Sequence, residues 1–199
     1  MRSRFAVFAP LAAFLLLVGL FAAMLMSDRN PQEIRSARVG GTVPAFTIDG
    51  LMDGEAPLSQ SDLVAADGAP VVVNFFASWC VPCRAEHASL MALANDYGVR
   101  VVGIAYKDET DAARGFIAGL GNPYARTGQD VSGRVGIDWG VSGVPESFVI
   151  AADGTITYRH WGPVIGAGLE TNLLPALEAA GWRRPAASPD ARETGGPGR

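Results

Sequence analysis

The chain has 199 residues, 49% hydrophobic side chains and a formal net charge of −4 from 16 basic and 20 acidic residues. This length favours one domain with appendages, and the hydrophobic content is sufficient for a packed core. The slight acidic excess gives no electrostatic reason for a nucleic-acid partner, so we expect none.

The first strong feature is an apolar run from Phe5 to Met26 without a charged side chain. The run is just long enough to cross a hydrocarbon core of about 30 Å as a helix. Arg2 and Arg4 precede it, and positive charge there favours a cytoplasmic N-terminus and an exported remainder. A cleavable signal peptide has a shorter apolar region, so we prefer the interpretation of residues 1–26 as an uncleaved anchor, a transmembrane helix.

Composition divides the rest of the chain into three parts. Residues 27–42 are polar and irregular, as in a short tether. Residues 43–182 contain the apolar patterns of a folded domain. Residues 183–199 are rich in Pro, Gly, Ala and charge without apolar periodicity, which indicates a disordered tail.

Within the domain, strands and helices alternate and are followed by a hairpin and a last helix. In chain order we expect one or two short strands within 44–58, a strand over 71–76, a helix that begins at Cys80 and is stopped by Gly98, a strand over 99–106, a helix over 108–120, a short helix over 130–137, two strands over 148–150 and 155–158, and a helix over 165–177. Asp153-Gly154 is a hairpin signal, and Pro175 should kink or split the last helix. Right-handed crossovers make the first two long strands parallel neighbours. The pattern predicts an α/β fold with a central mixed β-sheet flanked by helices.

Cys80 and Cys83 are the two cysteines of the chain, and they stand where a predicted strand gives way to a predicted helix. The free N–H groups and dipole of a helix N-terminus lower a thiol pKa from about 8.5. Cys80 is therefore the candidate nucleophile that attacks a substrate disulfide. Cys83, one turn inside the helix and less accessible, then attacks Cys80 and releases the reduced substrate.

The two residues between the cysteines, Val81 and Pro82, carry no charge. Pro82 supports the site by fixing φ at the start of the helix. We expect a reducing pair, nearer the thioredoxin potential of about −270 mV than the DsbA value of about −120 mV. The pair carries the electrons itself, so we expect no cofactor. A zinc site would need two more ligands, and the spacing of the two histidines does not supply them, so we expect no metal.

Two segments resemble the thioredoxin-like family, in particular the CcmG/DsbE branch of periplasmic thiol:disulfide interchange proteins for cytochrome c biogenesis. Residues 75–86, FFASWCVPCRAE, are similar to the active-site segment of that branch. Residues 139–148, WGVSGVPESF, are similar to its cis-proline segment, and a proline flanked by glycine before a strand suits a cis peptide bond. The resemblance implies a thioredoxin-like fold in which a cis Pro145 faces the cysteine pair, and a single-pass protein of a bacterial inner membrane with its domain in the periplasm.

The same resemblance implies a substrate and an electron donor. The substrate is the Cys-x-x-Cys-His motif of apocytochrome c, which must be reduced for haem attachment. An exported compartment is oxidising, so a membrane thiol–disulfide transporter of the DsbD or CcdA type is the implied donor. Three alternatives stay open: a general periplasmic reductase of the TlpA or ResA type acting on other periplasmic disulfide proteins, an apocytochrome or haem chaperone without redox turnover, and a metallochaperone.

The neighbours of the cysteines are the remaining candidate site residues. The resemblance implies that the backbone of Val144 pairs with a substrate peptide like an added strand. Trp79 is expected to pack beside Cys80 and shape the docking surface rather than join the core. Glu146 either contacts substrate or only begins the next strand.

Two polar residues near the cysteines raise a question about proton transfer. Asn74 stands where thioredoxins carry a buried Asp, and an amide cannot take a proton from the resolving thiol. Glu86, three residues after Cys83, is also present in the CcmG-like branch. Either Glu86 tunes or deprotonates the Cys83 thiol, or it is a solvated first-turn residue favoured by the helix dipole. The next residue, His87, is expected on the helix surface.

Overall fold

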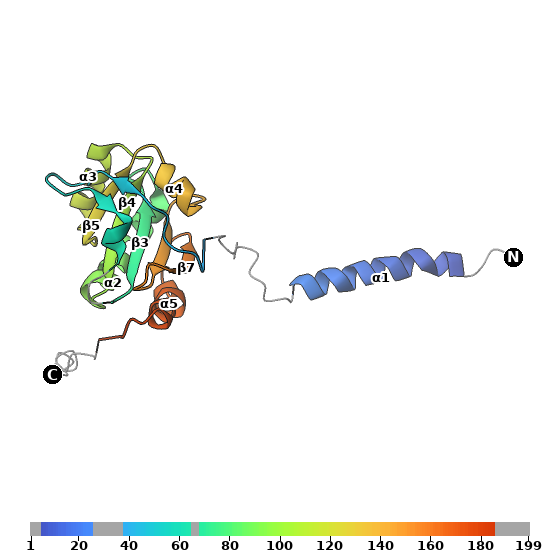
Figure 1. Ribbon diagram of the computed structural model, residues 1–199. Helices are drawn as coiled ribbons and strands as arrows, with labels where there is room; N and C mark the ends of the chain where they lie inside the picture. The colour runs from blue at the N-terminus through green and yellow to red at the C-terminus, as the bar shows by residue number, and fades with distance from the viewer. Residues whose placement is uncertain (1–4, 26–37, 65–67, 186–199) are drawn as a thin grey trace, which may run out of the picture. The chain divides into compact units, whose positions relative to one another are not determined.

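The computed structural model describes residues 5–25, 38–64 and 68–185 (Figure 1). The chain divides into two units, Met1–Ile34 and Arg35–Arg199. Of the anchor, tether and tail predicted above, residues 1–4, 26–37 and 186–199 lie outside the described residues.

The first unit contains the helix α1, Phe5–Leu25, and Pro10 lies in its second turn. Its side chains are described for residues 10–22. Among the residues that the structure describes, no helix combines the length and apolar character needed to span a membrane.

The second unit is built around a five-stranded mixed sheet in the order β5-β4-β3-β6-β7. The strands are β3 Val71–Phe76, β4 Arg100–Tyr106, β5 Arg126–Asp130, β6 Glu146–Ile150 and β7 Ile156–Trp161. β3 pairs in parallel with β4 and antiparallel with β6, and β6–β7 is the antiparallel hairpin that Asp153-Gly154 predicted. The predicted mixed sheet and the parallel pair of long strands are confirmed.

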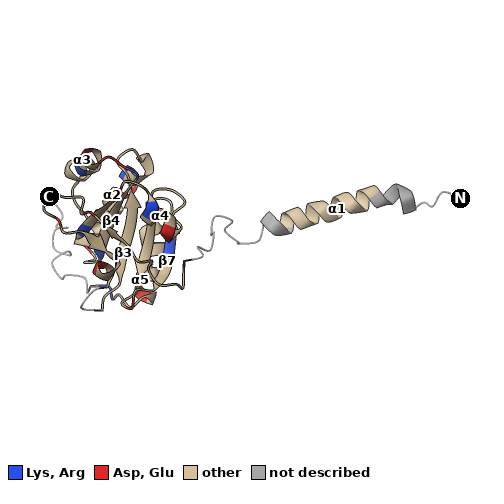
Figure 2. Ribbon diagram, turned by 45° about the horizontal axis from the view of Figure 1, so that its top comes forward, with Lys and Arg blue, Asp and Glu red and all other residues tan. Residues whose placement is uncertain are grey.

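β3 lies at the centre of the sheet, carries no charged residue (Figure 2), and is buried along its whole length. Successive side chains of a strand point to opposite faces. Val72 and Phe76 accordingly pack in one hydrophobic cluster, whereas Val73 and Phe75 pack in the other. Asn74 has the parity of the first pair, so this single polar residue of β3 is buried under the first cluster.

Helices cover both faces of the sheet. They are α2 Val81–Asn95, α3 Thr110–Leu120, α4 Arg134–Trp139 and α5 Leu174–Ala179, with a 3₁₀ turn η1 Gln60–Leu63 and a π-helical turn η2 Leu169–Leu173. Apolar side chains of α2, α3 and α5 join the cluster of Val72, and those of α4 join the cluster of Phe75. Pro175 stands in the first turn of α5, so the predicted split of the last helix occurs where η2 meets α5.

Two parts of the predicted pattern are wrong. β5 was missed, and the helix expected over 130–137 starts only at Arg134, because Asp130 still ends the strand. The sequence of β5, RTGQD, lacks the apolar alternation of a strand. Its edge is covered by the small β1–β2 ribbon, Thr47–Ile48 and Leu58–Ser59, against which Gly128 fits without room for a Cβ.

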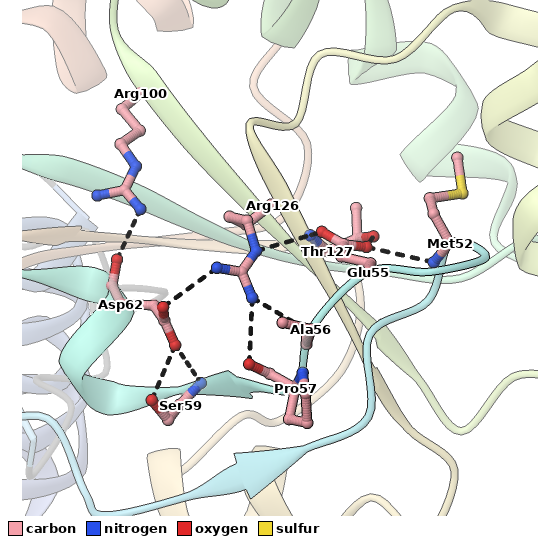
Figure 3. Close-up of polar contacts among 9 residues, drawn as sticks. All are labelled: Met52, Glu55, Ala56, Pro57, Ser59, Asp62, Arg100, Arg126 and Thr127. Atoms are coloured by element: carbon pink, nitrogen blue, oxygen red, sulfur yellow. Dashed lines mark hydrogen bonds and ion pairs between the residues drawn. The ribbon is translucent and has the colours of Figure 1, made fainter.

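An arginine on β5 fastens the segment with β1 and β2 to the sheet (Figure 3). Arg126 Nη1 lies 3.1 Å from Asp62 Oδ1, and Arg126 Nε lies 3.4 Å from Glu55 Oε1. Arg126 Nη2 donates to the carbonyl oxygens of Ala56 and Pro57 at 2.9 and 3.1 Å. These five residues are called the Arg126 clip below. The clip supplies two ion pairs where the sequence of β5 contains no large apolar side chain.

The ends of the expected tether and tail take part in the fold. Gly40 N donates to Ile156 O at 2.8 Å, and Thr42 forms a β-bridge with Thr155. At the other end, Arg184 lies 3.0 Å from the Glu170 carboxylate. The described residues 38–42 and 183–185 therefore extend the folded unit.

Candidate functional site

The cysteine pair lies at the N-terminus of α2, directly after β3. Cys80 is the N-cap residue of α2, and the backbone N–H of Cys83 donates to Cys80 Sγ at 3.1 Å. Pro82 occupies the first turn, where its missing N–H costs no helical hydrogen bond. The two cysteines form a disulfide with a Cα–Cα distance of 5.3 Å. The N–H of Cys83, in the first turn of α2, thus faces the Cys80 sulfur, which is the placement that stabilises a thiolate.

Both cysteines are largely covered in the disulfide form. Cys80 is 4% exposed and Cys83 is 2% exposed. The expected difference in accessibility is therefore slight in this state. The side chains on either side of Cys80 are far more open, with Trp79 at 59% and Val81 at 77%. Trp79 is not a core residue, and its ring is available to a docking partner.

An acidic residue missed by sequence reasoning holds the loop before Cys80. Asp108 is buried and accepts hydrogen bonds from Ser78 N at 2.6 Å and Ser78 Oγ at 2.8 Å. Beside it, Trp79 Nε1 donates to Lys107 O at 3.2 Å. The signal was available: β3 and β4 are parallel, so the residues after both strands meet at one edge of the sheet.

Glu86 is fully buried, so its interpretation as a solvated first-turn residue is wrong. Its Oε1 accepts from Asn74 Nδ2 at 2.9 Å, and its Oε2 accepts from Val164 N at 2.9 Å. Burial raises the pKa of Glu86 to about 7, although the hydrogen bonds from Val164 and Asn74 oppose the rise. The site thus holds a carboxyl group that can gain or lose a proton near neutral pH.

Asn74 connects Glu86 to two further polar side chains that the sequence did not reveal. Its Nδ2 also lies 3.0 Å from Ser147 Oγ, and its Oδ1 accepts from Tyr124 Oη at 2.9 Å. Ser147 stands directly opposite Asn74 on β6. Tyr124 lies in the loop before β5. Its position beside Asn74 therefore depends on β5, the strand that the sequence did not predict.

The cis-proline segment lies at the start of β6, and the Val144–Pro145 bond is cis, as expected. Pro145 O accepts from Gly162 N at 3.1 Å, which fixes the turn against the end of β7. Val144 is half-buried and packs against the cluster that contains both cysteines. The segment and the disulfide thus share one cluster.

Glu146 is the first residue of β6, which is one of the two roles left open for it. It is fully buried, accepts from Ser142 N at 3.1 Å and is ion-paired with Arg159, so it holds the turn before β6. One expectation is at odds with burial. His87 is 4% exposed, and its Nε2 lies 2.9 Å from Gly121 O, so it is not a surface residue. Burial lowers the pKa of His87.

Within the described residues, no group of three or more His, Cys, Asp or Glu side chains is arranged to hold a metal ion. The chemistry that the described site offers is a dithiol–disulfide pair at a helix N-terminus with a buried, titratable carboxyl group on the same helix.

Comparison with known proteins gives a consistent picture. The sequence profile of the family described as Redoxin matches residues 38–173. The thiol:disulfide interchange protein DsbE of Vibrio cholerae is 41% identical over 174 residues, covering 86% of this chain and 92% of the relative. The corresponding protein CycY of Rhizobium leguminosarum bv. viciae is 49% identical over 154 residues, covering 77% and 73%. The crystal structure of a putative thiol:disulfide interchange protein DsbE from Chlorobium tepidum has a TM-score of 0.56 and 28% identity, covering 70% of this chain and 97% of that one.

Proposed function

Because the chain belongs to the Redoxin family and is a thiol:disulfide oxidoreductase, we propose that it reduces the Cys-x-x-Cys-His disulfide of apocytochrome c in the bacterial periplasm. The observation that carries this proposal is the Cys80–Cys83 disulfide at the N-terminus of α2. The resemblance of residues 75–86 and 139–148 to the cytochrome c maturation branch supports the choice of substrate.

The reaction proceeds through a mixed disulfide. The Cys80 thiolate attacks one substrate sulfur, the substrate S–S bond breaks, and the other substrate sulfur leaves as a thiolate. The Cys83 thiolate then attacks Cys80 Sγ and displaces the second substrate thiolate. Two electrons pass from the dithiol to the substrate, and the disulfide seen between Cys80 and Cys83 is the product.

Glu86 receives the proton of the Cys83 thiol before that second attack. The two residues are three positions apart on α2, a spacing that brings side chains to about 5–6 Å at Cβ. A base works best when its pKa lies near the operating pH, and the value of about 7 for Glu86 meets that condition. Asn74 supports Glu86 by donating to its carboxylate.

The docking surface consists of Trp79, Val144 and Pro145. The exposed ring of Trp79 contacts the substrate beside its disulfide, and the backbone of Val144 pairs with the substrate peptide as an added strand.

The domain is held at the membrane by the N-terminal segment. Support comes from the sequence: the run Phe5 to Met26 carries no charge, and its length as a helix would be about 33 Å, enough for a hydrocarbon core of about 30 Å. Since the periplasm is oxidising, the dithiol is regenerated by a membrane electron donor of the DsbD or CcdA type. Retention of the full chain in membranes after carbonate washing tests the anchor.

A trapping experiment tests the substrate. Cys83→Ser is mixed with an oxidised peptide carrying the Cys-x-x-Cys-His motif, and with a peptide in which alanine replaces the histidine. We expect a mixed disulfide at Cys80 that forms at least about tenfold faster with the first peptide, while Cys80→Ser forms none. Equal rates would indicate a general reductase. If the Cys80→Ser, Cys83→Ser double variant still supports cytochrome c assembly in cells, the protein acts as a chaperone and the proposal fails.

A further inference from the structure

Three buried side chains from distant parts of the sequence form a hydrogen-bonded row that ends on Glu86. Tyr124 Oη donates to Asn74 Oδ1 at 2.9 Å, and Asn74 Nδ2 donates to Glu86 Oε1 at 2.9 Å. Asn74 and Glu86 are fully buried, and Tyr124 is 6% exposed. A buried tyrosine hydroxyl placed two hydrogen bonds from a titratable acid requires an explanation beyond packing.

The fold fixes the Tyr124 ring in this position. The ring stacks on Phe76, with centroids 5.0 Å apart and planes at 18°. It also lies over Gly103, where an added Cβ would come within 2.8 Å of the ring atoms. Gly103 is the β4 residue opposite Asn74 in the register of the sheet. The missing side chain at Gly103 therefore opens the path by which Tyr124 reaches Asn74.

The hydrogen bond from Tyr124 determines which end of the Asn74 amide faces Glu86. An amide has one accepting oxygen and one donating nitrogen. With Oδ1 held by the tyrosine hydroxyl, both N–H groups are directed elsewhere, to Glu86 Oε1 and to Ser147 Oγ at 3.0 Å. In this orientation Asn74 donates to a carboxylate and cannot accept the proton of a neutral carboxyl group. The arrangement therefore favours the ionised form of Glu86.

We propose that Tyr124 is a positioning residue: its hydroxyl orients the Asn74 amide toward the Glu86 carboxylate and thereby sets the pH range in which Glu86 can take a proton. The consequence for Cys83 rests on the proposed function, whereas the effect on Glu86 does not.

The proposal gives a direction for the effect of removing one oxygen atom. In Tyr124→Phe the amide is released and can turn its oxygen toward Glu86, where it accepts the proton of the neutral carboxyl group. The neutral form is then favoured, so the titration midpoint of Glu86 should rise by about half to one pH unit. The ring, its stacking on Phe76 and the covering of the site remain.

The experiment is a carboxyl ¹³C NMR titration of the full chain in its disulfide form, with ¹³C-labelled glutamate and the Glu86 signal assigned by Glu86→Gln. The cysteines do not titrate in this form. The other titratable side chains beside the row are His87, next to Glu86 on α2, and His160, opposite Ser147 on β7; burial lowers the pKa of both, and both are present in every variant compared. Tyr97→Phe is the matched control, since it removes a tyrosine hydroxyl that donates to Glu170, an acid far along the sequence from the site. We expect an upward shift in Tyr124→Phe and none in Tyr97→Phe. An unchanged or lowered midpoint in Tyr124→Phe overturns the proposal.

A second pair of variants tests whether the effect passes through Asn74. Asn74→Ala removes the donor and should itself raise the midpoint, and adding Tyr124→Phe to it should change nothing further. A persisting tyrosine effect in the Asn74→Ala background overturns the proposal, as does an Asn74→Ala midpoint equal to that of the wild type. If Tyr124→Phe alone does not fold, the titration midpoint of Glu86 in Asn74→Ala is compared with that of the wild type instead. None of these titrations depends on turnover. The peptide-trapping experiment can therefore fail while the Tyr124 proposal holds, and the reverse, so the two failures can be told apart.

Discussion

The Arg126 clip and the Glu86 site are both clusters around carboxylates, but they face different partners. In the clip, Glu55 and Asp62 lie within 3.4 Å of the Arg126 guanidinium. At Glu86, each carboxylate oxygen accepts from a neutral group, the Asn74 amide and the Val164 backbone N–H. The clip contains a compensating positive charge, whereas Asn74 and Val164 supply Glu86 with hydrogen bonds from neutral groups.

The pKa directions follow this difference. Burial acts to raise the pKa of Asp62, but hydrogen bonds from Ser59 and the charge of Arg126 outweigh it, so the pKa is lowered. At Glu86 burial prevails and the pKa rises to about 7. A compensated acid stays ionised and serves the fold, whereas an uncompensated buried acid titrates where thiol chemistry needs a base. If this contrast is correct, a mutation at Glu86 should chiefly lower the rate of disulfide exchange, and a mutation in the clip should chiefly lower the free energy of unfolding.

The largest expected effect is on the rate, at Glu86. In Glu86→Gln the Cys83 thiol loses its proton acceptor, so resolution of the mixed disulfide at pH 7 should slow about 100-fold, within the usual range for a general base. Quenched single-turnover reactions with an oxidised peptide would show the mixed disulfide accumulating. Arg126→Met should reduce the peptide within about twofold of the wild-type rate. A Glu86→Gln rate within threefold of wild type would remove Glu86 from the mechanism.

The next effect is on stability, at the clip. Arg126→Met leaves the Glu55 and Asp62 carboxylates without their cation and removes a donor from two carbonyl groups. Since these side chains are partly exposed, we expect the free energy of unfolding to fall by about 2–3 kcal/mol. Urea unfolding at pH 7 measures the loss. A change below about 0.5 kcal/mol would mean that β1 and β2 stay attached to β5 without the clip.

The sequence predicted the part of the site that is local in the chain. Cys80, Pro82 and Cys83 sit at the start of a helix because strand and helix periodicity meet at that point. The pattern also predicted the central strand pair and the hairpin, whose apolar runs are unambiguous. The turn before Pro145 required the resemblance in addition, since glycine and proline alone do not determine the peptide isomer.

What the sequence could not predict depends on contacts between distant segments. Whether Glu86 is solvated or buried follows from Asn74, 12 positions earlier, and from Val164, 78 positions later. β5 was missed because its polar residues are stabilised by the Arg126 clip and the β1–β2 ribbon rather than by apolar alternation. A local pattern contains no information about such partners, so it left the burial of Glu86 open and placed His87 wrongly on the helix surface.

A smaller effect gives the two clusters opposite signs of pH dependence. Between about pH 4.5 and 7 the unfolded chain has lost the proton that folded Glu86 still holds, so this residue lowers stability as pH rises. Glu86→Gln should therefore be more stable than wild type by about 1–2 kcal/mol at pH 8 and show no gain at pH 4.5. Asp62→Asn should instead lose stability at pH 8, and the loss should diminish only as the pH falls below 3.8, through the lowered pKa of folded Asp62. Urea unfolding at three pH values measures both, and equal signs at pH 8 would contradict the contrast.

The smallest effect is the response to salt, which distinguishes a paired charge from a buried acid. Sodium chloride at 1 M shortens the Debye length to about 3 Å, so it screens the partly exposed clip. The stability difference between wild type and Arg126→Met should therefore shrink, by less than about 1 kcal/mol. The difference between wild type and Glu86→Gln should not change, because Glu86 is fully buried and out of reach of salt ions. Comparing differences between variants cancels the general effect of salt on hydrophobic burial. If salt altered the Glu86→Gln difference as much as the Arg126→Met difference, then Glu86 would be interacting with an exposed charge and burial alone could not account for its raised pKa.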